Sequence, residues 1–377
     1  MATLSQLKVS RLLLLALLFA QQSVFALLNI DGERNQVFVF GSASLTYDSN
    51  LLAQRDGESD VGENFALGAE WHRRAGIIAV DATSSITAYR FNQHSALDAV
   101  DPNLVVLFSK TSGRLTGSLS LSAYRTQQAD SAVNLRTSSW NFPVELSLRY
   151  PINEKFYATS DSAAQNRQFE DRNAGLQNYL DFAEGLDGYY VYNSKIDALA
   201  GYRVRFGRTD VDRTIDHDFH VGVTGQIFPK VTGVIHVGIQ RREIRGTGLG
   251  FNETSASAQL TWTATRKLTV VGLVGRDFNT TATSASVDSL STSLSADYGL
   301  NRRFQFGAGI SGGRNRFLDE TVAGRVDDFF SWYVEGTYNV NEHFKVVSRY
   351  TYFDNQSDEF LAEFDRNQFS ITLSGRY

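Results

Sequence analysis

Cysteine is absent from this sequence of 377 residues, and proline occurs only four times. Without cysteine the chain can form no disulfide framework, thiolate metal site, cysteine nucleophile or lipid-modified cysteine anchor. After residue 26, no apolar run approaches the ~18 residues that a membrane-spanning helix needs. The formal net charge is only −5, and no basic cluster forms a nucleic-acid-binding footprint. These absences exclude a disulfide-stabilised secreted protein, a helical membrane protein and a nucleic-acid-binding protein.

The amino terminus has the three parts of a secretory signal peptide. Lys8 and Arg11 supply positive charge, residues 12–20 are apolar, and Val24 and Ala26 place small side chains before a cleavage site. The apolar run is too short to cross a bilayer of ~30 Å as a helix. We therefore expect cleavage after Ala26, so that residues 1–26 are removed and residues 27–377 form a single mature domain.

Side chains alternate between apolar and polar along the last nine residues of the chain. Phe369, Ile371, Leu373 and Tyr377 fall on one parity, and serine, threonine and arginine fall on the other. Successive side chains of a β-strand point to opposite faces, so this strand has one apolar face and one wet face. The edge strand of a soluble sandwich alternates too. A dozen or so such segments, beginning with residues 36–47, favour instead a barrel with lipid outside and water inside.

Connections between these segments are short and long in turn. Residues 75–76 and 301–302 form short ones, and residues 48–62 form a long polar one. Barrels of bacterial outer membranes have short periplasmic turns and longer extracellular loops. The pattern therefore predicts an all-β protein, a closed antiparallel up-and-down transmembrane barrel in the outer membrane of a Gram-negative bacterium. Eighteen strands are favoured within a range of 16–18, because the strand boundaries in 103–110 and 167–193 are unclear.

A Tyr-x-x-Asn-x-x-Phe corner recurs at three short connections. Asparagine favours the turn, and aromatic side chains suit a membrane boundary. Any β-protein could use such a hairpin corner, but three copies in an exported chain favour an aromatic girdle on the periplasmic side. Its expected members are Tyr150, Phe156, Tyr298, Phe304, Tyr338 and Phe344. On the lipid face of the last strand, Phe369 and Tyr377 are expected to act as the signal for barrel assembly.

The polar parity is expected to line the lumen, and it carries charges of both signs. The pore-lining candidates are Arg149, Arg203, Arg205, Asp181, Asp197, Glu335 and Arg349. The arginines could contact an anionic solute in a water-filled pore. Alternatively, ion pairs between these residues could hold the wall, which the mixed signs favour. Small residues expected to face inward, at positions 183, 201, 222, 307 and 309, favour an open bore.

Two residues break the strand pattern. Pro143 lies inside a strand of a barrel that has no edge, so we expect a local bulge there. Glu184 falls on the lipid parity, so we expect a register shift or a position near the membrane interface.

Residues suited to catalysis form no known motif. His217 and His220 are three residues apart, so on a strand they face opposite sides and cannot share a metal. The spacing Gly-x-Ser-x-Gly occurs at residues 309–313, but it lies inside an alternating strand segment and not at a strand-to-helix elbow. No phosphate-binding loop occurs. An outer-membrane hydrolase would need Ser and His on neighbouring strands at matched height. We expect no enzyme activity, no metal and no cofactor.

Segments at both ends of the mature chain resemble a family of porin-like outer-membrane barrels. These segments are residues 41–52 (GSASLTYDSNLL), 350–357 (YTYFDNQS) and 364–369 (FDRNQF). Some members of that family are encoded with exopolysaccharide biosynthesis and export genes. The resemblance implies an outer-membrane barrel with a role in polysaccharide secretion, and it implies no catalytic residue.

Two functions remain open from the sequence. The first is a channel for a polysaccharide or another hydrophilic solute. The second is a non-conducting barrel whose long loops bind a partner or a surface polysaccharide. The expected partners are outer-membrane lipid, the barrel-assembly machinery and polysaccharide export components, and no nucleic acid.

Overall fold

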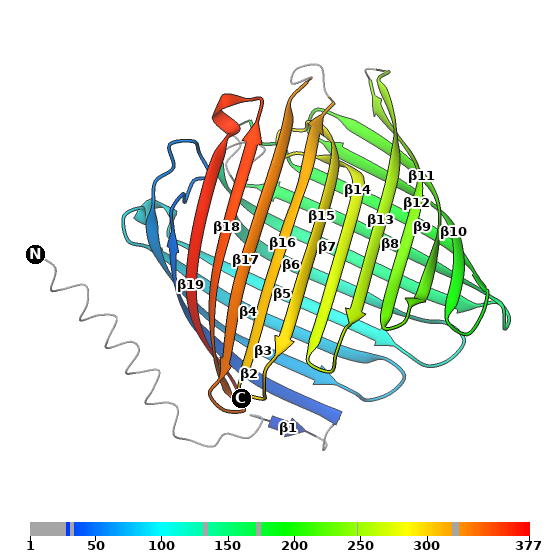
Figure 1. The fold of residues 1–377 in the computed structure, drawn as a ribbon, viewed down its shortest axis with the longest axis horizontal. Coiled ribbons are helices and arrows are strands. Elements are labelled where there is room, and N and C mark those ends of the chain that lie inside the picture. The colour runs from blue at the N-terminus through cyan, green and yellow to red at the C-terminus, as the bar shows by residue number, and fades with distance from the viewer. Residues whose placement is uncertain (1–27, 31–33, 131–134, 171–174, 247, 319–323) are drawn as a thin grey trace, which may run out of the picture.

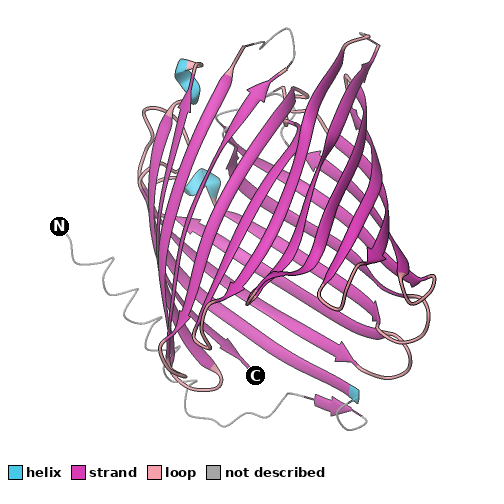
Figure 2. Cartoon of the chain, turned by 45° about the vertical axis from the view of Figure 1, so that its right-hand side comes forward, coloured by secondary structure: helices cyan, strands magenta, loops and turns pink. Residues whose placement is uncertain are grey.

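The computed structural model describes residues 28–30, 34–130, 135–170, 175–246, 248–318 and 324–377. The predicted leader, residues 1–26, lies outside the described residues. Strands dominate the described ranges, with two short 3₁₀ turns, η3 (Ser95–Leu97) and η4 (Phe360–Ala362), in long connections (Figure 2). Within these ranges, no helix has both the length and the apolar character needed to cross a membrane.

Strands β2 to β19 form one closed antiparallel barrel (Figure 1). Each strand pairs with the next along the chain, and β19 pairs with β2 from Gln368↔Asp48 to Arg376↔Phe40. The short strand β1 (Leu28–Ile30) pairs with the beginning of β2. The barrel strands are β2 (Asn35–Asp48), β3 (Asp60–Arg73), β4 (Ala79–Phe91), β5 (Ala99–Lys110), β6 (Thr116–Asp130), β7 (Leu135–Pro151), β8 (Phe156–Phe169), β9 (Tyr179–Val191), β10 (Ile196–Thr209), β11 (Arg213–Phe228), β12 (Val231–Arg245), β13 (Gly250–Thr263), β14 (Leu268–Thr280), β15 (Ser286–Gly299), β16 (Phe304–Phe317), β17 (Val326–Asn339), β18 (Phe344–Ser357) and β19 (Phe364–Arg376).

The predicted all-β barrel and the larger predicted strand number, eighteen, are confirmed by strands β2 to β19. Of the two regions with unclear boundaries, residues 103–110 belong to β5, and residues 167–193 contain the end of β8 and all of β9. Short turns gather at one end of the barrel, which also holds the carboxyl terminus, and long connections gather at the other (Figure 1). We call these the short-turn end and the long-loop end.

A side-chain oxygen stabilises several of the short turns by accepting two backbone N–H groups. Between β7 and β8, Asn153 Oδ1 accepts the N–H groups of Lys155 and Phe156, both at 2.9 Å. The acceptors in turns of this kind are Asn153, Asn193, Asn301, Asn341 and Thr265. The sequence repeat misses the turn at Asn193 because Ile196 stands where the other copies have phenylalanine.

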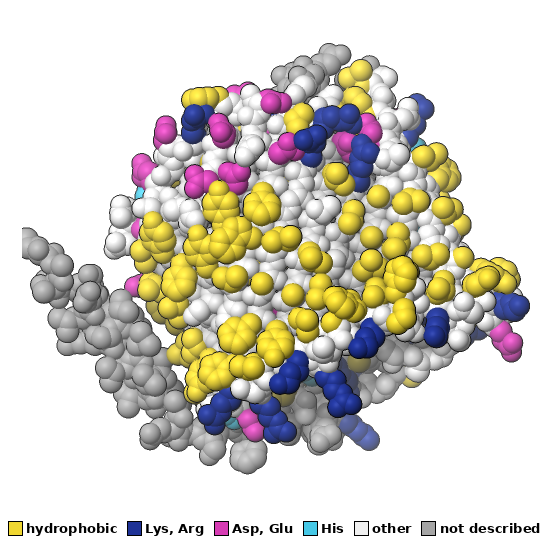
Figure 3. All heavy atoms as spheres, in the orientation of Figure 1, with side chains coloured by type: hydrophobic (Ala, Val, Ile, Leu, Met, Phe, Trp, Pro, Cys, Tyr) yellow, Lys and Arg dark blue, Asp and Glu magenta, His cyan; other side chains and the backbone are white. Residues whose placement is uncertain are grey.

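The outer face carries a belt of exposed apolar side chains between two charged rims (Figure 3). Leu67 is 73% exposed, Leu186 60% and Ile310 53%, and all lie mid-strand on the lipid parity. So continuous an apolar surface would be unfavourable in water, whereas hydrocarbon suits it. The belt therefore fits a membrane-spanning surface.

The six predicted girdle residues lie at the short-turn ends of their strands. The rings of Phe304 and Tyr338 are neighbours across β16 and β17, with centroids 4.9 Å apart. Phe156 makes a similar contact with Tyr190 at 5.2 Å. These aromatic side chains thus border the apolar belt on one side.

We expect the substitution Phe304→Arg to destabilise the barrel less than Ile310→Arg. A charge at the boundary of the membrane costs about 0–1 kcal/mol, against ~2–4 kcal/mol at the midplane. Ile310 lies further along β16, inside the belt. Unfolding by denaturant of each variant refolded into lipid would measure the difference. Equal losses at the two positions would contradict the depths assigned to them.

Neither of the two irregularities takes the expected form. No bulge forms at Pro143: the register is the same on both sides, from Leu121↔Val144 to Tyr124↔Asn141, and the ladder with β6 is only interrupted between them. The register around Glu184 is also continuous. Glu184 is mid-strand on the outer parity, where Ser160 donates a hydrogen bond to its carboxylate at 2.8 Å. Local hydroxyl partners thus replace the predicted shift.

Candidate functional site

Contacts that cross the barrel identify the inner wall. Arg203 on β10 binds Asp277 on β14 at 2.9 Å, although β11, β12 and β13 separate these strands. Within a closed barrel such a contact must pass through the interior. Arg203 therefore faces the lumen, and so does Arg205, which has the same parity and also reaches Asp277, at 3.3 Å.

An ion network joins four strands at the long-loop end of this wall. Arg205 binds Asp216 on β11 at 2.7 Å, and Arg242 on β12 binds the same carboxylate through two nitrogens at 2.7 and 2.8 Å. Arg242 is only 1% exposed. We call Arg205, Asp216, Arg242 and Asp277 the inner clamp. Each of its charges has a partner, which avoids the large cost of an unpaired buried ion.

The inner clamp holds the last residues of β14, at the long-loop end, inside the barrel mouth. Arg242 donates a hydrogen bond to the carbonyl of Asn279 at 2.7 Å, and Arg205 donates to the carbonyl of Phe278. The Phe278 side chain is completely buried, with its ring centroid 5.2 Å from the Arg242 guanidinium carbon. Pairing between β13 and β14 stops at Arg276, so beyond that residue β14 parts from β13.

The connection after β14, residues 281–285, continues across the mouth. The carbonyl of Ala282 accepts the N–H of Gln177, in the connection between β8 and β9, at 2.8 Å. Ser284 shares a hydrogen bond of 2.7 Å with Thr209, the last residue of β10. Ala282 also joins a small buried apolar cluster with side chains from β8 and the connection after it. These contacts tie strands far apart in the ring and narrow the mouth.

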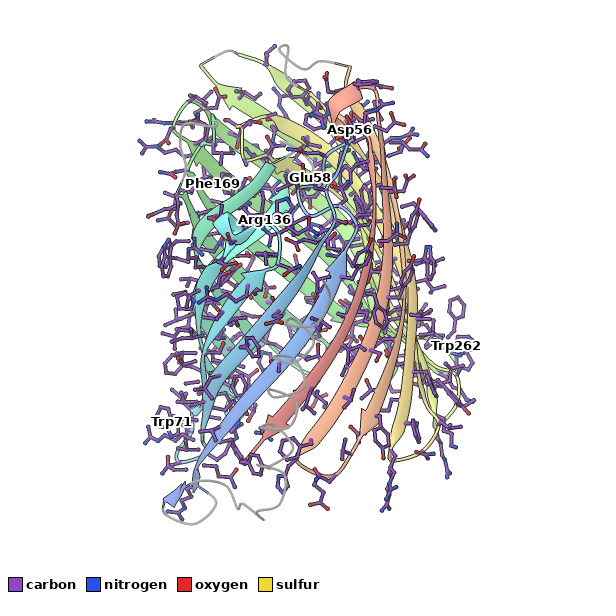
Figure 4. The ribbon with its side chains drawn as sticks, turned by 90° about the vertical axis from the view of Figure 1, so that its left-hand side faces the viewer. Asp56, Glu58, Trp71, Arg136, Phe169 and Trp262 are labelled. Atoms are coloured by element: carbon purple, nitrogen blue, oxygen red, sulfur yellow. The ribbon has the colours of Figure 1, made fainter. Side chains whose placement is uncertain are left out.

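The connection between β2 and β3, residues 49–59, also reaches across the long-loop end. The carbonyl of Leu51 accepts a hydrogen bond of 3.4 Å from Arg136 on β7, which β3 to β6 separate from β2. Leu51 is only 2% exposed. Figure 4 shows Arg136 below Asp56 and Glu58, which belong to this connection. Two connections therefore cover parts of the same mouth.

A histidine links this covering connection to the next one. His94, between β4 and β5, contacts Asp60 at 2.9 Å and Glu58 at 2.7 Å. The hydrogen bond to Asp60, and next that to Glu58, raise the pKa of His94 above its ordinary value. Protonated His94 binds the two carboxylates more strongly than neutral His94. Its contribution to the stability of the folded protein is therefore present at low pH and is lost as pH rises through the raised pKa.

The other predicted pore-lining residues make short-range contacts in the wall. Asp197 accepts a hydrogen bond of 2.8 Å from Tyr157, and the guanidinium of Arg149 lies 3.9 Å from the centroid of the same ring. Arg349 binds Glu335 at 3.4 Å. Arg349 and Glu335 face each other on neighbouring strands, and both side chains keep partial exposure to the interior.

Asp181 lies on the inner parity of β9, opposite Gly207, but among the residues described it does not form the ion pair that the sequence suggested. Its Oδ1 is buried without a hydrogen-bond partner in the described part of the chain. The inner arginines Arg203 and Arg205 bind Asp277 and Asp216 instead of Asp181 and Asp197. Strand parity could have placed Asp216 on the inner wall. Nothing in the sequence signals that the end of β14 turns inward to meet it.

At the inward glycines, neighbouring side chains fill the space that a side chain would occupy. A Cβ at Gly201 would lie 1.9 Å from Asp187 Oδ1, which contacts His220 at 3.0 Å. A Cβ at Gly309 would lie 2.5 Å from the ring of Tyr333. These glycines thus let polar and aromatic side chains lie flat against the wall. In the described residues, no cluster of His, Asp and Glu is arranged to hold a metal ion.

The short-turn end carries a strongly basic rim (Figure 3). In the short connections, the carboxylates are Glu154 and Glu342. The cations of these connections, which we call the basic rim, are Arg74, Arg114, Lys155, Lys195, Lys230, Arg266, Lys267, Arg302 and Arg303. Some of them also connect neighbouring turns by hydrogen bonds: Lys230 donates to the carbonyl of Ala264 at 3.0 Å. The rim is cationic although the whole chain has a net charge of −5.

Comparison with known proteins agrees with this architecture. Residues 214–377, which run from the second residue of β11 through β19, match a family model described as "Putative beta-barrel porin 2". The crystal structure of OpdO from Pseudomonas aeruginosa is similar at 12% identity and a TM-score of 0.51, over 92% of this chain and 97% of that chain. OccAB2 from Acinetobacter baumannii is similar at 11% identity and a TM-score of 0.50, over 92% and 98%. No curated protein matches the sequence. By its fold the chain is a closed porin-like β-barrel, and its carboxyl-terminal part is similar to β-barrel porins.

Proposed function

We propose that this chain is an outer-membrane channel of a Gram-negative bacterium that passes hydrophilic solutes. One observation carries the proposal: a single closed barrel combines an apolar outer belt with a charged inner wall. Hydrocarbon suits the first surface and water suits the second. The similarity of residues 214–377 to β-barrel porins supports the same function.

Anionic solutes are the class that the charge distribution favours. The basic rim surrounds the short-turn end, and fixed cations at a mouth raise the local concentration of anions. Salt screens this effect over a Debye length of ~10 Å at 0.1 M. An acidic polysaccharide belongs to this solute class, and the resemblance to barrels encoded with exopolysaccharide genes supports a role in its secretion. Polysaccharide export components would then be partners on the periplasmic side.

A second candidate function has its own observation. The inner clamp and the connections 281–285 and 49–59 partly cover the mouth at the long-loop end. If these connections closed the mouth completely, the barrel would conduct nothing, and its long loops would then serve to bind a partner or a surface polysaccharide. Conductance separates the two functions.

We expect the purified protein in planar lipid bilayers to show discrete conductance steps with a preference for anions. The preference should fall as the KCl concentration rises, because salt screens the basic rim. Replacing Lys195, Arg266 and Arg302 together by serine should weaken the preference, since it removes exposed rim cations. Reversal potentials in a salt gradient measure it.

The matched control keeps the charges: Lys195→Arg, Arg266→Lys and Arg302→Lys should retain the anion preference. Folded protein that conducts at no voltage would refute the channel and favour the loop-binding barrel. If the serine variant conducts with unchanged anion preference, the role of the basic rim is refuted but the channel function is not.

A further inference from the structure

A row of arginines lies on the outer face near the long-loop end. Arg208, Arg213 and Arg245 are direct register partners on β10, β11 and β12. They share the outward parity of exposed apolar residues such as Phe206 and Ile239, and all three are exposed. In the described part of the chain, the arginines of β10 to β12 that form ion pairs are Arg203, Arg205, Arg241 and Arg242. None of the three register partners is among them. We call these three residues the arginine row.

Along the outward positions of β10 to β12, arginines outnumber carboxylates. Like charges directly opposite each other on neighbouring strands repel. Arg241, four residues before Arg245 on β12, adds a fourth outward cation nearer the belt, and its side chain is 57% exposed. Among the outward positions of β10 to β12, all of which are described, Glu243 supplies the one carboxylate, and Arg241 binds it at 3.0 Å. The arginine row is thus left to water or to an external anion.

A groove of about 630 Å³ opens on the same face, on the side of the arginine row that faces the belt. Its lining residues are His217, Phe219, Ile239, Gln240, Arg241, Asn252, Glu253 and Thr254. The Glu253 carboxylate is held by Arg276 at 2.6 Å and also by Arg316. Arg241 and His217 lie toward the long-loop end, whereas Phe219 and Ile239, which are 57% and 67% exposed, lie toward the belt. The groove is therefore polar at one end, next to the arginine row, and apolar at the other.

We propose that the arginine row and this groove bind a phosphorylated glycolipid of the outer leaflet. The guanidinium groups would take its phosphates, for which their planar fork is well suited, and the apolar end of the groove would take an acyl chain. Adjacent strands are ~4.8 Å apart, so the arginine row spreads its charge over ~10 Å, enough for a headgroup with more than one phosphate. The inference rests on the proposed outer-membrane location, which puts the long-loop end in the outer leaflet.

The test measures lipid retention by native mass spectrometry of the purified full-length protein in detergent. The probes are bis-phosphorylated lipid A, its dephosphorylated form and phosphatidylglycerol. We expect selective retention of the first probe. The double variant Arg213→Ser with Arg245→Ser should bind it roughly tenfold more weakly, because it removes charge-assisted hydrogen bonds. The matched control is Arg314→Ser, which removes an outward arginine that is already paired with Asp328 at 2.6 Å.

Each outcome decides the assignment. Equal retention of dephosphorylated lipid A would refute phosphate recognition, and equal retention of phosphatidylglycerol would refute the glycolipid. An equal loss in Arg314→Ser would show general charge attraction and refute the site. Retention is measured without conductance, so a conducting protein that retains no glycolipid overturns this inference alone. A non-conducting protein that retains it overturns only the channel.

Discussion

Deleting residues 368–377 should abolish the folded barrel, both in cells and on refolding into detergent or lipid. This segment forms most of β19, which pairs with β18 on one side and with β2 on the other. Its loss leaves two rows of backbone N–H and C=O groups unpaired. Each unpaired group costs several kcal/mol in hydrocarbon, where no water can replace the lost partner. Heat-modifiable migration on electrophoresis and the β-sheet signal in circular dichroism measure the folded fraction.

A second variant separates closure from the predicted assembly signal. Replacing Phe369 and Tyr377 together by alanine removes both aromatic side chains and keeps the backbone, including the two 2.8 Å bonds between Val39 and Tyr377. This variant should still fold in detergent but accumulate less in outer-membrane fractions. Normal assembly of the deletion variant would contradict closure, and normal assembly of the alanine variant would contradict the signal.

The substitution Arg242→Ala should destabilise the barrel by about 3 kcal/mol, the lower end of the cost of breaking a buried ion pair. It removes two hydrogen bonds to the buried carboxylate of Asp216, which keeps Arg205 as a partner. Arg242 also holds the carbonyl of Asn279, so the end of β14 should be released from the mouth. Single-channel conductance should therefore rise in the variant molecules that fold. Denaturant unfolding measures the loss of stability, and planar bilayers measure the conductance.

The control Arg314→Ala removes an exposed arginine from β16 and should leave the unfolding midpoint unchanged, since surface ion pairs contribute little. An unchanged midpoint in Arg242→Ala would contradict the inner clamp. A destabilised variant with unchanged conductance would show that the clamp stabilises the wall without narrowing the mouth.

The strands of this protein could be predicted because their signal is local. Side chains alternate with a period of two, so parity alone placed Phe369 and Ile310 on the outer face and Arg203 and Arg205 on the inner wall. The number of strands followed from the alternation of short and long connections. The expectations at Pro143 and Glu184 were wrong: the ladder is interrupted at Pro143 without a change of register, and a serine hydroxyl hydrogen-bonds Glu184 in the middle of its strand.

The partners of the inner arginines were decided by the tertiary structure alone. Sequence parity offered Asp181 and Asp197, but the inward turn of β14 brings Asp277 to Arg203 and Arg205, and the register of β11 brings Asp216 to Arg205. The register of neighbouring strands likewise aligns the arginine row, whose members are scattered along the sequence. Parity is a property of each short segment, whereas register and the path of β14 depend on how the whole ring closes.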